Sequence, residues 1–542
     1  MNPASLLSPG RNCWRIAQAS RFALLVDAAA CFAAVRAALH EASHSIFILS
    51  WDIDSRMRLV PDGANDGWPE PLGDFLHALV SARPALQVRL LDWDYTLLYA
   101  MEREWLPARL GWRRHKRLQF RRDGRHPVGA AHHQKVIVVD DALAFVGGLD
   151  LTSARWDTPE HRWQDTRRLR SDGEPYEPFH DVQAMVEGDV ARALGDLFRE
   201  RWRRATGKAL PAAAAQASVR SCWPVDVTPD LVDVDIAIAR TEPAYDGRPA
   251  IHEIAHWYAD VIARAQHSLV FENQYFTSTL VADALSRRLA APQGPQVLIV
   301  SPRKQSGWLE EATMGVLRSR VHRRLQQADG HGRYRLVCPA LPDDGDGYLN
   351  VHSKLCFADD DAMTIGSANL SNRSMACDTE CNLCIVADGA DERNERLRKG
   401  IAAMRARLLG EHLAVEPEQV LHACRQAASL FSAIDALSRP PRCLKTFEPL
   451  AQPEMDALIP QQAPFDPGRP TASHHWLAPW RPAASHEPLP RRVIALALLA
   501  ILWCGFGALL AVALLLAGLG VATRRLIGDH DGDRAVRRTG RP

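Results

Sequence analysis

The stretch HHQKVIVVDDALAFVGGLDL, residues 132–151, decides the fold and points to the chemistry. It places His133, Lys135 and Asp140 in the spacing H-x-K-x4-D, and a Gly-Gly pair follows the aspartate. A second stretch, HSKLCFADDDAMTIGSANLS at residues 352–371, repeats this spacing and is followed by Gly-Ser at the matching place. Two copies with the same trailing pair of small residues indicate a duplicated half-site.

Each copy predicts a hairpin. In the second copy the signature residues are His352, Lys354 and Asp359. A His and a Lys two positions apart point to the same face of a strand. In the first copy the apolar run 136–139 predicts a buried strand, Asp-Asp a turn, and 142–146 the returning strand. Each hairpin should therefore present one imidazole and one ammonium at a common surface.

Two imidazoles and two ammoniums around one small space suit the cleavage of a phosphodiester. The ammoniums would hold the non-bridging oxygens and balance charge in the transition state. One histidine would attack phosphorus and form a phosphohistidine, while the other would protonate the leaving oxygen and then activate water or an alcohol. This chemistry requires no metal or cofactor. The alternative, core histidines beside surface lysines, explains one H-x-K well but explains a doubled signature poorly.

With this doubled signature the chain resembles the phospholipase D superfamily, and the resemblance extends from about residue 20 to residue 410. Further segments that carry the likeness are WDIDSRMRL, LLDWDYTLLYAMEREWLP, GGLDLTSARWDTPEHRWQD and GSANLSNRSM, which look more like phospholipase D proper than like the short nucleases of the superfamily. The resemblance implies an α/β fold of two tandem α/β/α sandwich halves that share one active site. It also implies that His133 is the nucleophile and His352 the general acid/base.

The resemblance further implies a carboxylate that orients each histidine. Asp165, in RWQD, and Glu380, in CDTEC, follow the second strand of their hairpins, and we carry this role to them. Asp140 and Asp359 belong to the signature as catalytic-motif residues, although we expect them to pin the hairpin rather than to touch substrate.

The small-residue pairs should lie at the substrate phosphate. Gly148 lets the backbone approach a ligand, and Ser367 stands at the same place in the second copy. Asn369 could donate to a phosphate oxygen together with Lys135 and Lys354. Its counterpart in the first copy is an aspartate, which cannot donate when ionised, so the two halves are not equivalent.

Helix–strand units before each signature repeat as well, in 32–51 and 257–276, which supports internal duplication. We therefore expect a first half at 20–205, a linker at 206–245 with one strand near its end, and a second half at 246–412. Residues 413–490 should be helical and then a Pro-rich linker.

Residues 493–522 carry no charge over thirty positions between arginine pairs, which predicts a transmembrane helix. We expect a protein anchored by this helix, in the inner membrane of a bacterium with the catalytic part in the cytoplasm. The basic stretch 108–125 suits either a lip that meets anionic lipid headgroups or an ordinary solvated face.

Composition excludes several classes of protein. The chain has 542 residues, is 47% apolar and 24% charged, and has a formal net charge of +1, so no global field attracts nucleic acid. Eleven cysteines do not make a disulfide scaffold and favour a reducing compartment. Cys377, Cys381 and Cys384 match an iron–sulfur spacing, but CNLCIVA alternates as a strand, so we reject that interpretation.

These observations favour a membrane-anchored phospholipase D-type enzyme that acts on glycerophospholipids, with a phospholipid membrane as partner and water or an alcohol as acceptor. A cardiolipin-synthase-like phosphatidyltransferase is the first alternative, and a nuclease is a weaker one. A catalytically dead scaffold would be expected to show degraded signatures, whereas both are intact.

Overall fold

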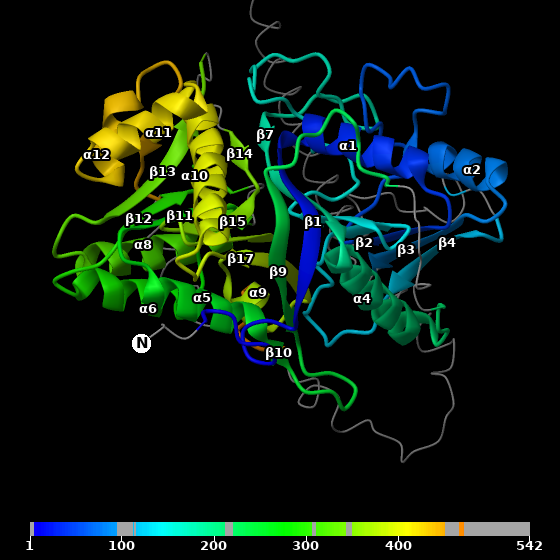
Figure 1. Cartoon of the computed structure of the whole chain (residues 1–542), viewed down its shortest axis with the longest axis horizontal. Coiled ribbons are helices and arrows are strands. Elements are labelled where there is room, and N and C mark those ends of the chain that lie inside the picture. The colour runs from blue at the N-terminus through cyan, green and yellow to red at the C-terminus, as the bar shows by residue number, and fades with distance from the viewer. Residues whose placement is uncertain are drawn as a thin grey trace, which may run out of the picture. The chain divides into compact units, whose positions relative to one another are not determined.

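Strands buried on both faces form the centre of the molecule (Figure 1). The computed structural model describes residues 5–94, 112, 115–211, 221–305, 310–342, 349–449 and 466–470. The strands are β1 (Arg15–Val26), β2 (Ser45–Ser50), β3 (Gln87–Trp93), β4 (Leu118–Asp123), β5 (Val136–Val139), β6 (Leu143–Gly147), β7 (Phe179–His180), β8 (Val182–Gly188), β9 (Leu231–Glu242), β10 (Ile251–His252), β11 (Ser268–Asn273), β12 (Gln296–Val300), β13 (Tyr334–Ala340), β14 (Asn350–Val351), β15 (Lys354–Ala358), β16 (Ala362–Gly366), β17 (Glu380–Val386) and β18 (Cys443–Thr446).

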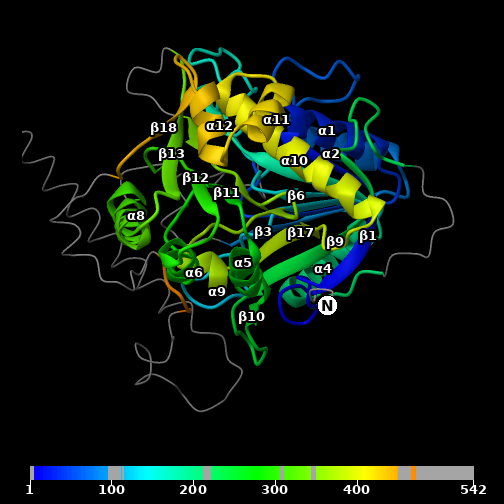
Figure 2. The same ribbon diagram turned by 60° about the vertical axis from the view of Figure 1, so that its left-hand side comes forward.

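Helices cover both faces of the strands. They are α1 (Asp27–Glu41), α2 (Leu72–Ala82), α4 (Asp189–Thr206), α5 (Glu253–Arg264), α6 (Thr279–Ala290), the π-helical turn η2 (Glu311–Gly315), α8 (Val316–Ala328), α9 (Asn372–Ala376), α10 (Glu392–Leu413), α11 (Pro417–Gln426) and α12 (Leu430–Leu437). Figure 2 shows α10, α11 and α12 on one side of the second-half strands and α5, α6 and α8 on the other.

The sheet has a near-symmetric order about its centre. It runs β18-β13-β12-β11-β15-β16-β17-β9-β1-β8-β6-β5-β2-β3-β4, with β10 paired to β9. Outward from the antiparallel pair β1–β9, the order β8, β6, β5, β2, β3, β4 mirrors β17, β16, β15, β11, β12, β13. The two expected halves are therefore present as duplicated α/β units, and their sheets join into one.

Alternation along each strand separates three apolar cores. Phe47 and Leu49 of β2 face a core shared by α4 and α10, whereas Ile46 and Ile48 face α1 and α2. The second half repeats this with Val270 on the shared core, while the neighbouring residues of β11 face α5 and α6. One core thus spans both halves, and each half has a further core of its own.

Most predicted elements are confirmed, and the boundaries need correction. The two signature hairpins form as β5–β6 and β15–β16. Residues 206–245 contain β9, a central strand of the sheet, and β1 begins before residue 20. The helical start predicted after residue 412 is present as α11 and α12, but it is followed by β18, which closes the sheet beside β13. Of the predicted Pro-rich linker, only residues 466–470 are among the described residues. A strand was missed there because CLKT is too short to show alternation.

Among the residues that the structure describes, no helix is long and apolar enough to cross a membrane. The predicted span 493–522 lies outside those residues. The described residues all belong to one compact unit, which the contacts delimit as Met1–Ala472.

The signature aspartates fix the strand next to their own hairpin. Asp140 has a left-handed backbone with φ 53° and accepts hydrogen bonds from the backbone amides of Ser43, His44 and Ser45 at 2.6–2.7 Å. Asp359, with φ 52°, does the same for residues 266–268 at 2.7–2.8 Å. These bonds hold the first residue of β2 or β11 against the hairpin, as the sequence predicted.

Replacing Asp140 should therefore destabilise the fold. Asp140→Ala removes acceptors for three amides and places a Cβ-bearing residue without a polar side chain at positive φ, so we expect a loss of about 2–4 kcal/mol. Asp140→Asn keeps one acceptor and a residue that tolerates this backbone, and should lose about half as much. Urea denaturation measures both. Asp226→Ala, at an exposed position, is the control, and an Asp140→Ala curve that overlays it would contradict this role.

Candidate functional site

The two signatures meet at the seam between the halves. His133 and Lys135 lie just before β5, and His352 and Lys354 lie at the start of β15. The residues just before each signature strand form backbone hydrogen bonds with the opposite half. The His133 amide donates to the Thr379 carbonyl at 3.0 Å, and the His352 amide donates to the His180 carbonyl at 2.8 Å. Each half thus holds the backbone of the other half's histidine.

The carboxylate partners are exchanged between halves in the same way. Nδ1 of His133 lies 3.0 Å from both carboxylate oxygens of Glu380, in the second half. Nδ1 of His352 lies 2.6 Å from Oδ2 of Asp181, in the first half. Both carboxylates are fully buried. A carboxylate on Nδ1 fixes the tautomer that leaves Nε2 free to act on a substrate.

Asp165 does not take the place that the sequence suggested. It forms an ion pair with Arg167 at 2.6 Å, and Nδ1 of each histidine is held by another carboxylate. The residue that sequence reasoning missed is Asp181. The register shows the equivalence, because Gln183 pairs with Gly147 as Asn382 pairs with Gly366.

In each half the orienting carboxylate lies two positions before the residue that pairs with the signature glycine. The sequence signal that could have identified Asp181 is this repeated spacing, D-x-Q in the first half and E-x-N in the second. A long loop, residues 148–178, separates Asp181 from its hairpin, and counting residues from the signature hid the match.

Gly148 makes room for the Asp181 carboxylate rather than for a close approach of substrate to the backbone. A Cβ on Gly148 would lie 2.1 Å from Oδ1 of Asp181, so only glycine leaves room for the carboxylate. At the equivalent place in the second half, the Ser367 hydroxyl donates to Glu380. The small pair after each strand therefore shapes the seat of the orienting carboxylate.

The two lysines have different partners. Nζ of Lys135 pairs with Asp150 at 3.1 Å, whereas Nζ of Lys354 donates to Oε1 of Gln274 at 3.1 Å. Asn369, the counterpart of Asp150, is buried, and its Oδ1 has no hydrogen-bond partner among the described residues. One lysine is thus neutralised by a carboxylate and the other is not, which confirms that the halves are not equivalent.

Burial sets the protonation of the site. It lowers the pKa of His133, which Lys135 lowers further, and it raises the pKa of Glu380 to about 8, with Asp378 adding to the rise. Both shifts favour the uncharged forms of the imidazole and of the carboxyl group.

The second histidine lies among groups that titrate close to neutrality. Burial raises the pKa of Asp181 to about 6 and lowers the pKa of Lys354 to about 7. Burial, Lys354 and Arg155 lower the pKa of His352. The ionised state of this half of the site therefore depends on pH within the physiological range.

Arg155 is a further cation that the sequence did not single out. Its guanidinium lies 5.1 Å from the ring centroid of Phe179, and that ring is 5.3 Å from the ring of His352. Ala154, just before it, has a left-handed backbone with φ 60°, which a non-glycine residue adopts at a cost. The site therefore collects three cations around two neutral imidazoles, which suits an anionic substrate.

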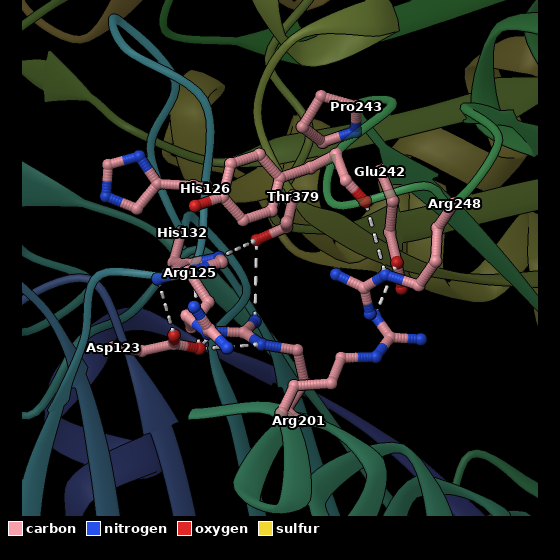
Figure 3. Close-up of a pocket in the computed structure, with 11 residues that line it drawn as sticks. Asp123, Arg125, His126, His132, Arg201, Glu242, Pro243, Arg248 and Thr379 are labelled. Atoms are coloured by element: carbon pink, nitrogen blue, oxygen red, sulfur yellow. Dashed lines mark hydrogen bonds and ion pairs between the residues drawn. The ribbon is translucent and has the colours of Figure 1, made fainter. Parts of the chain in front are cut away.

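A polar pocket is lined by residues of several elements, among them His132, Arg201 and Glu242 (Figure 3). Arg201 pairs with Asp123 at 2.7 Å, and Nε2 of His132 is 3.2 Å from the same carboxylate. Arg204 pairs with Glu242 of the second half at 2.7 Å. These pairs brace the strand that carries the first signature.

A second buried cluster joins the halves beside Asp181. Its members are Asp27, His161, His180, Glu272, Glu411 and His412. Nδ1 of His180 is 2.9 Å from both Asp27 and Glu411, and its Nε2 is 3.1 Å from Glu272. Burial acts to lower the pKa of His180, but these three carboxylates raise it well above its usual value. The same donor atoms are of the kinds that bind a divalent cation.

The partner of His352 can be checked without an activity assay. We expect Nδ1 of His352 to carry the proton, because Asp181 only accepts when ionised. Asp181→Asn introduces a donor at this place and should shift the ring to the other tautomer, as long-range ¹⁵N spectra of the histidines would show. Asp165→Asn is the matched control and should leave the His352 signals unchanged. A shift in the control but not in Asp181→Asn would contradict the pairing.

Comparisons with known proteins match this sequence to a family. Residues 112–282 match the family model described as phospholipase D, and residues 258–402 match the one described as cardiolipin synthase, phospholipase D-like domain. Phospholipase D alpha 1 of Nicotiana tabacum is 23% identical over 72% of this chain and 65% of its own length. Phospholipase D A of Dictyostelium discoideum is 24% identical over 73% of this chain and 36% of its own length.

The chain thus spans less than two thirds of the length of these relatives. Among solved structures, phosphatidylserine synthase of Haemophilus influenzae aligns with a TM-score of 0.45 at 15% identity, over 71% of this chain and 88% of its own. The two family matches each contain one complete signature, and together they extend across both halves of the sheet. The chain belongs to the phospholipase D superfamily.

Proposed function

We propose that this protein is a phospholipase D-type phosphodiesterase and transphosphatidylase that acts on glycerophospholipids through a phosphohistidine. The observation that carries the proposal is the paired geometry: each imidazole has Nδ1 on a buried carboxylate from the opposite half, and a lysine two residues along. Such a pair can deliver one nucleophile and one proton carrier to the same phosphorus atom.

His133 would be the nucleophile, in keeping with the family resemblance. Its Nε2 attacks phosphorus and forms the P–N bond, and the P–O bond to the headgroup alcohol breaks. His352 gives its proton to that leaving oxygen. Water or another alcohol then loses a proton to His352 and attacks the phosphohistidine, which releases His133 and the phosphatidyl product.

The cations explain how His352 becomes an acid when substrate binds. In the free site burial lowers the pKa of His352, and Lys354, Arg155 and Lys135 lower it further. A phosphodiester anion held by the lysines offsets their charge, so that the imidazolium is favoured only when there is a substrate to protonate. Asn369 would complete the seat of the phosphate, whereas Ser367, also expected there, donates its hydroxyl to Glu380 instead.

A lipid substrate is supported by the sequence beyond the described residues. An uncharged stretch at 493–522 is long enough to cross a bilayer, and an enzyme tethered there would meet phospholipids at high local concentration. Net charge near zero and signatures without a basic, aromatic-lined groove disfavour nucleic acid.

The second candidate is a cardiolipin-synthase-like phosphatidyltransferase. The match of residues 258–402 to the cardiolipin synthase model favours it. The covalent intermediate would be the same, and the acceptor would be the glycerol hydroxyl of another lipid rather than water.

Product analysis tests the proposal and separates it from the alternative. The full chain in mixed vesicles of labelled phosphatidylcholine, phosphatidylethanolamine and phosphatidylglycerol, with ethanol, should release headgroup and form phosphatidylethanol. His133→Ala should abolish turnover and ³²P labelling of the protein, while His352→Ala should retain label because the phosphohistidine is not hydrolysed. Asp226→Ala is the control variant. Cardiolipin as sole product would favour the transferase, and cleavage of oligonucleotides alone would exclude both.

The pH dependence should reflect the groups around His352. Below about pH 6 Asp181 becomes protonated and no longer holds Nδ1, so kcat/KM falls. Above about pH 7 the free enzyme loses the charge of Lys354, and kcat/KM falls again. Lys354→Arg keeps its charge, so its weaker activity should lack the alkaline limb. A flat profile from pH 5 to 9 on a soluble short-chain substrate would contradict this assignment.

A further inference from the structure

Residues 466–470 reach the site from well beyond the duplicated halves. Asp466 is 1% exposed, although the repeat ends near residue 412. Its carboxylate accepts four hydrogen bonds: from the Thr277 hydroxyl at 2.7 Å, from the amide and side chain of Asn372 at 3.1 and 3.0 Å, and from the Arg373 amide at 2.9 Å. One buried carboxylate thus joins the loop after β11 to the start of α9.

Hydrogen bonds connect Thr277, one of the residues that Asp466 holds, with the surroundings of Lys354. The amides of Thr277 and Ser278 donate to the Leu370 carbonyl at 2.8 and 2.9 Å, and the Leu370 amide donates to Oδ1 of Asn273 at 3.0 Å. The next residue, Gln274, accepts from Nζ of Lys354. Leu370 itself follows Asn369, so both expected phosphate contacts of the second half depend on this junction.

The Arg373 side leads to His133. The Arg373 guanidinium pairs with Asp378 at 2.6 Å, and Oδ1 of Asp378 accepts the amide of Ala131 at 2.8 Å. Ala131 is two residues before His133, and Glu380, two residues after Asp378, holds the His133 ring. Asp466 is therefore connected through hydrogen bonds both to the segment that holds His133 and to the loops that hold Lys354 and Asn369.

We infer that Asp466 is a positioning residue for the reaction: the C-terminal segment supplies the carboxylate that locks the loop 366–373 in its working geometry. This inference rests on the proposed function for its catalytic part and on the contacts alone for its structural part. Its four donors come from three residues that are buried or half-buried, so removing the carboxylate leaves them unsatisfied rather than hydrated in place.

The effect should fall on kcat more than on KM. Small displacements of Lys354, Asn369 and His133 spoil the alignment at phosphorus, and a misplacement of about 1 Å can cost on the order of 100-fold in rate. Lipid binding away from the phosphate is unchanged. For Asp466→Ala we therefore expect a fall in kcat of about 10- to 100-fold with KM within about twofold.

The test uses the full chain and two independent readouts. Hydrogen exchange of peptides covering 366–380 reports the lock whatever the substrate, and kcat and KM with a phospholipid report its consequence. Arg469→Ala, an exposed position in the same segment, is the matched control. Added formate, which can occupy the space left by the side chain in Asp466→Ala, should restore part of kcat in that variant only.

The outcomes separate the two claims. Faster exchange at 366–380 with a kcat loss rescued by formate supports the inference. Wild-type exchange and wild-type kcat in Asp466→Ala overturn it, as does a kcat loss matched by Arg469→Ala. If the wild-type protein turns over no phospholipid, the proposed function fails, and unchanged exchange in Asp466→Ala would then overturn the lock separately.

Discussion

The hydrogen bond between each histidine and a carboxylate of the opposite half is the constraint on which the site depends. Glu380 holds His133 and Asp181 holds His352, so neither half contains a complete catalytic dyad. The continuous sheet through β1 and β9 is what brings the two exchanged pairs into register. A change in the packing at this seam would alter both imidazoles at once, whereas a change in one outer strand would not.

Burial of the charged groups is compatible with folding only because nearly all of them are paired. Buried ions that lose a partner are costly, and the seam holds carboxylates, imidazoles, lysines and an arginine in close contact. The His180–Glu272 and Arg204–Glu242 pairs join opposite charges across the halves, and Arg201 pairs with Asp123 within the first half. Lys354 is the exception, because its hydrogen-bond partners are uncharged: the amide of Gln274 and the carbonyl and Nδ1 of His352. An unneutralised cation at this place is understandable if its counter-ion is the substrate.

Sequence reasoning succeeded where physical signals are local. Strand periodicity and repeated spacing over short stretches predicted the two hairpins and the duplication. They also predicted that Asp140 and Asp359 pin the hairpins. It failed where the relation is tertiary. Asp165 lay at a plausible distance along the chain, but the loop 148–178 displaces the true partner, Asp181, and the exchange of Glu380 to the first-half histidine leaves no trace in local pattern. The closing strand β18 and the reach of Asp466 were missed for the same reason.

The differences between the halves indicate why duplication did not keep two equal sites. Asp181 has room only because Gly148 lacks a side chain, while Glu380 receives an added hydrogen bond from Ser367. Lys135 is neutralised by Asp150, but the matching position in the second half is the amide Asn369. A carboxylate beside one lysine and an amide beside the other make the second half the more electropositive, so the anionic phosphodiester should lean toward Lys354. In the proposed mechanism this would place its charge next to His352, the proposed acid, and would leave Nε2 of the neutral His133 facing phosphorus as the proposed nucleophile.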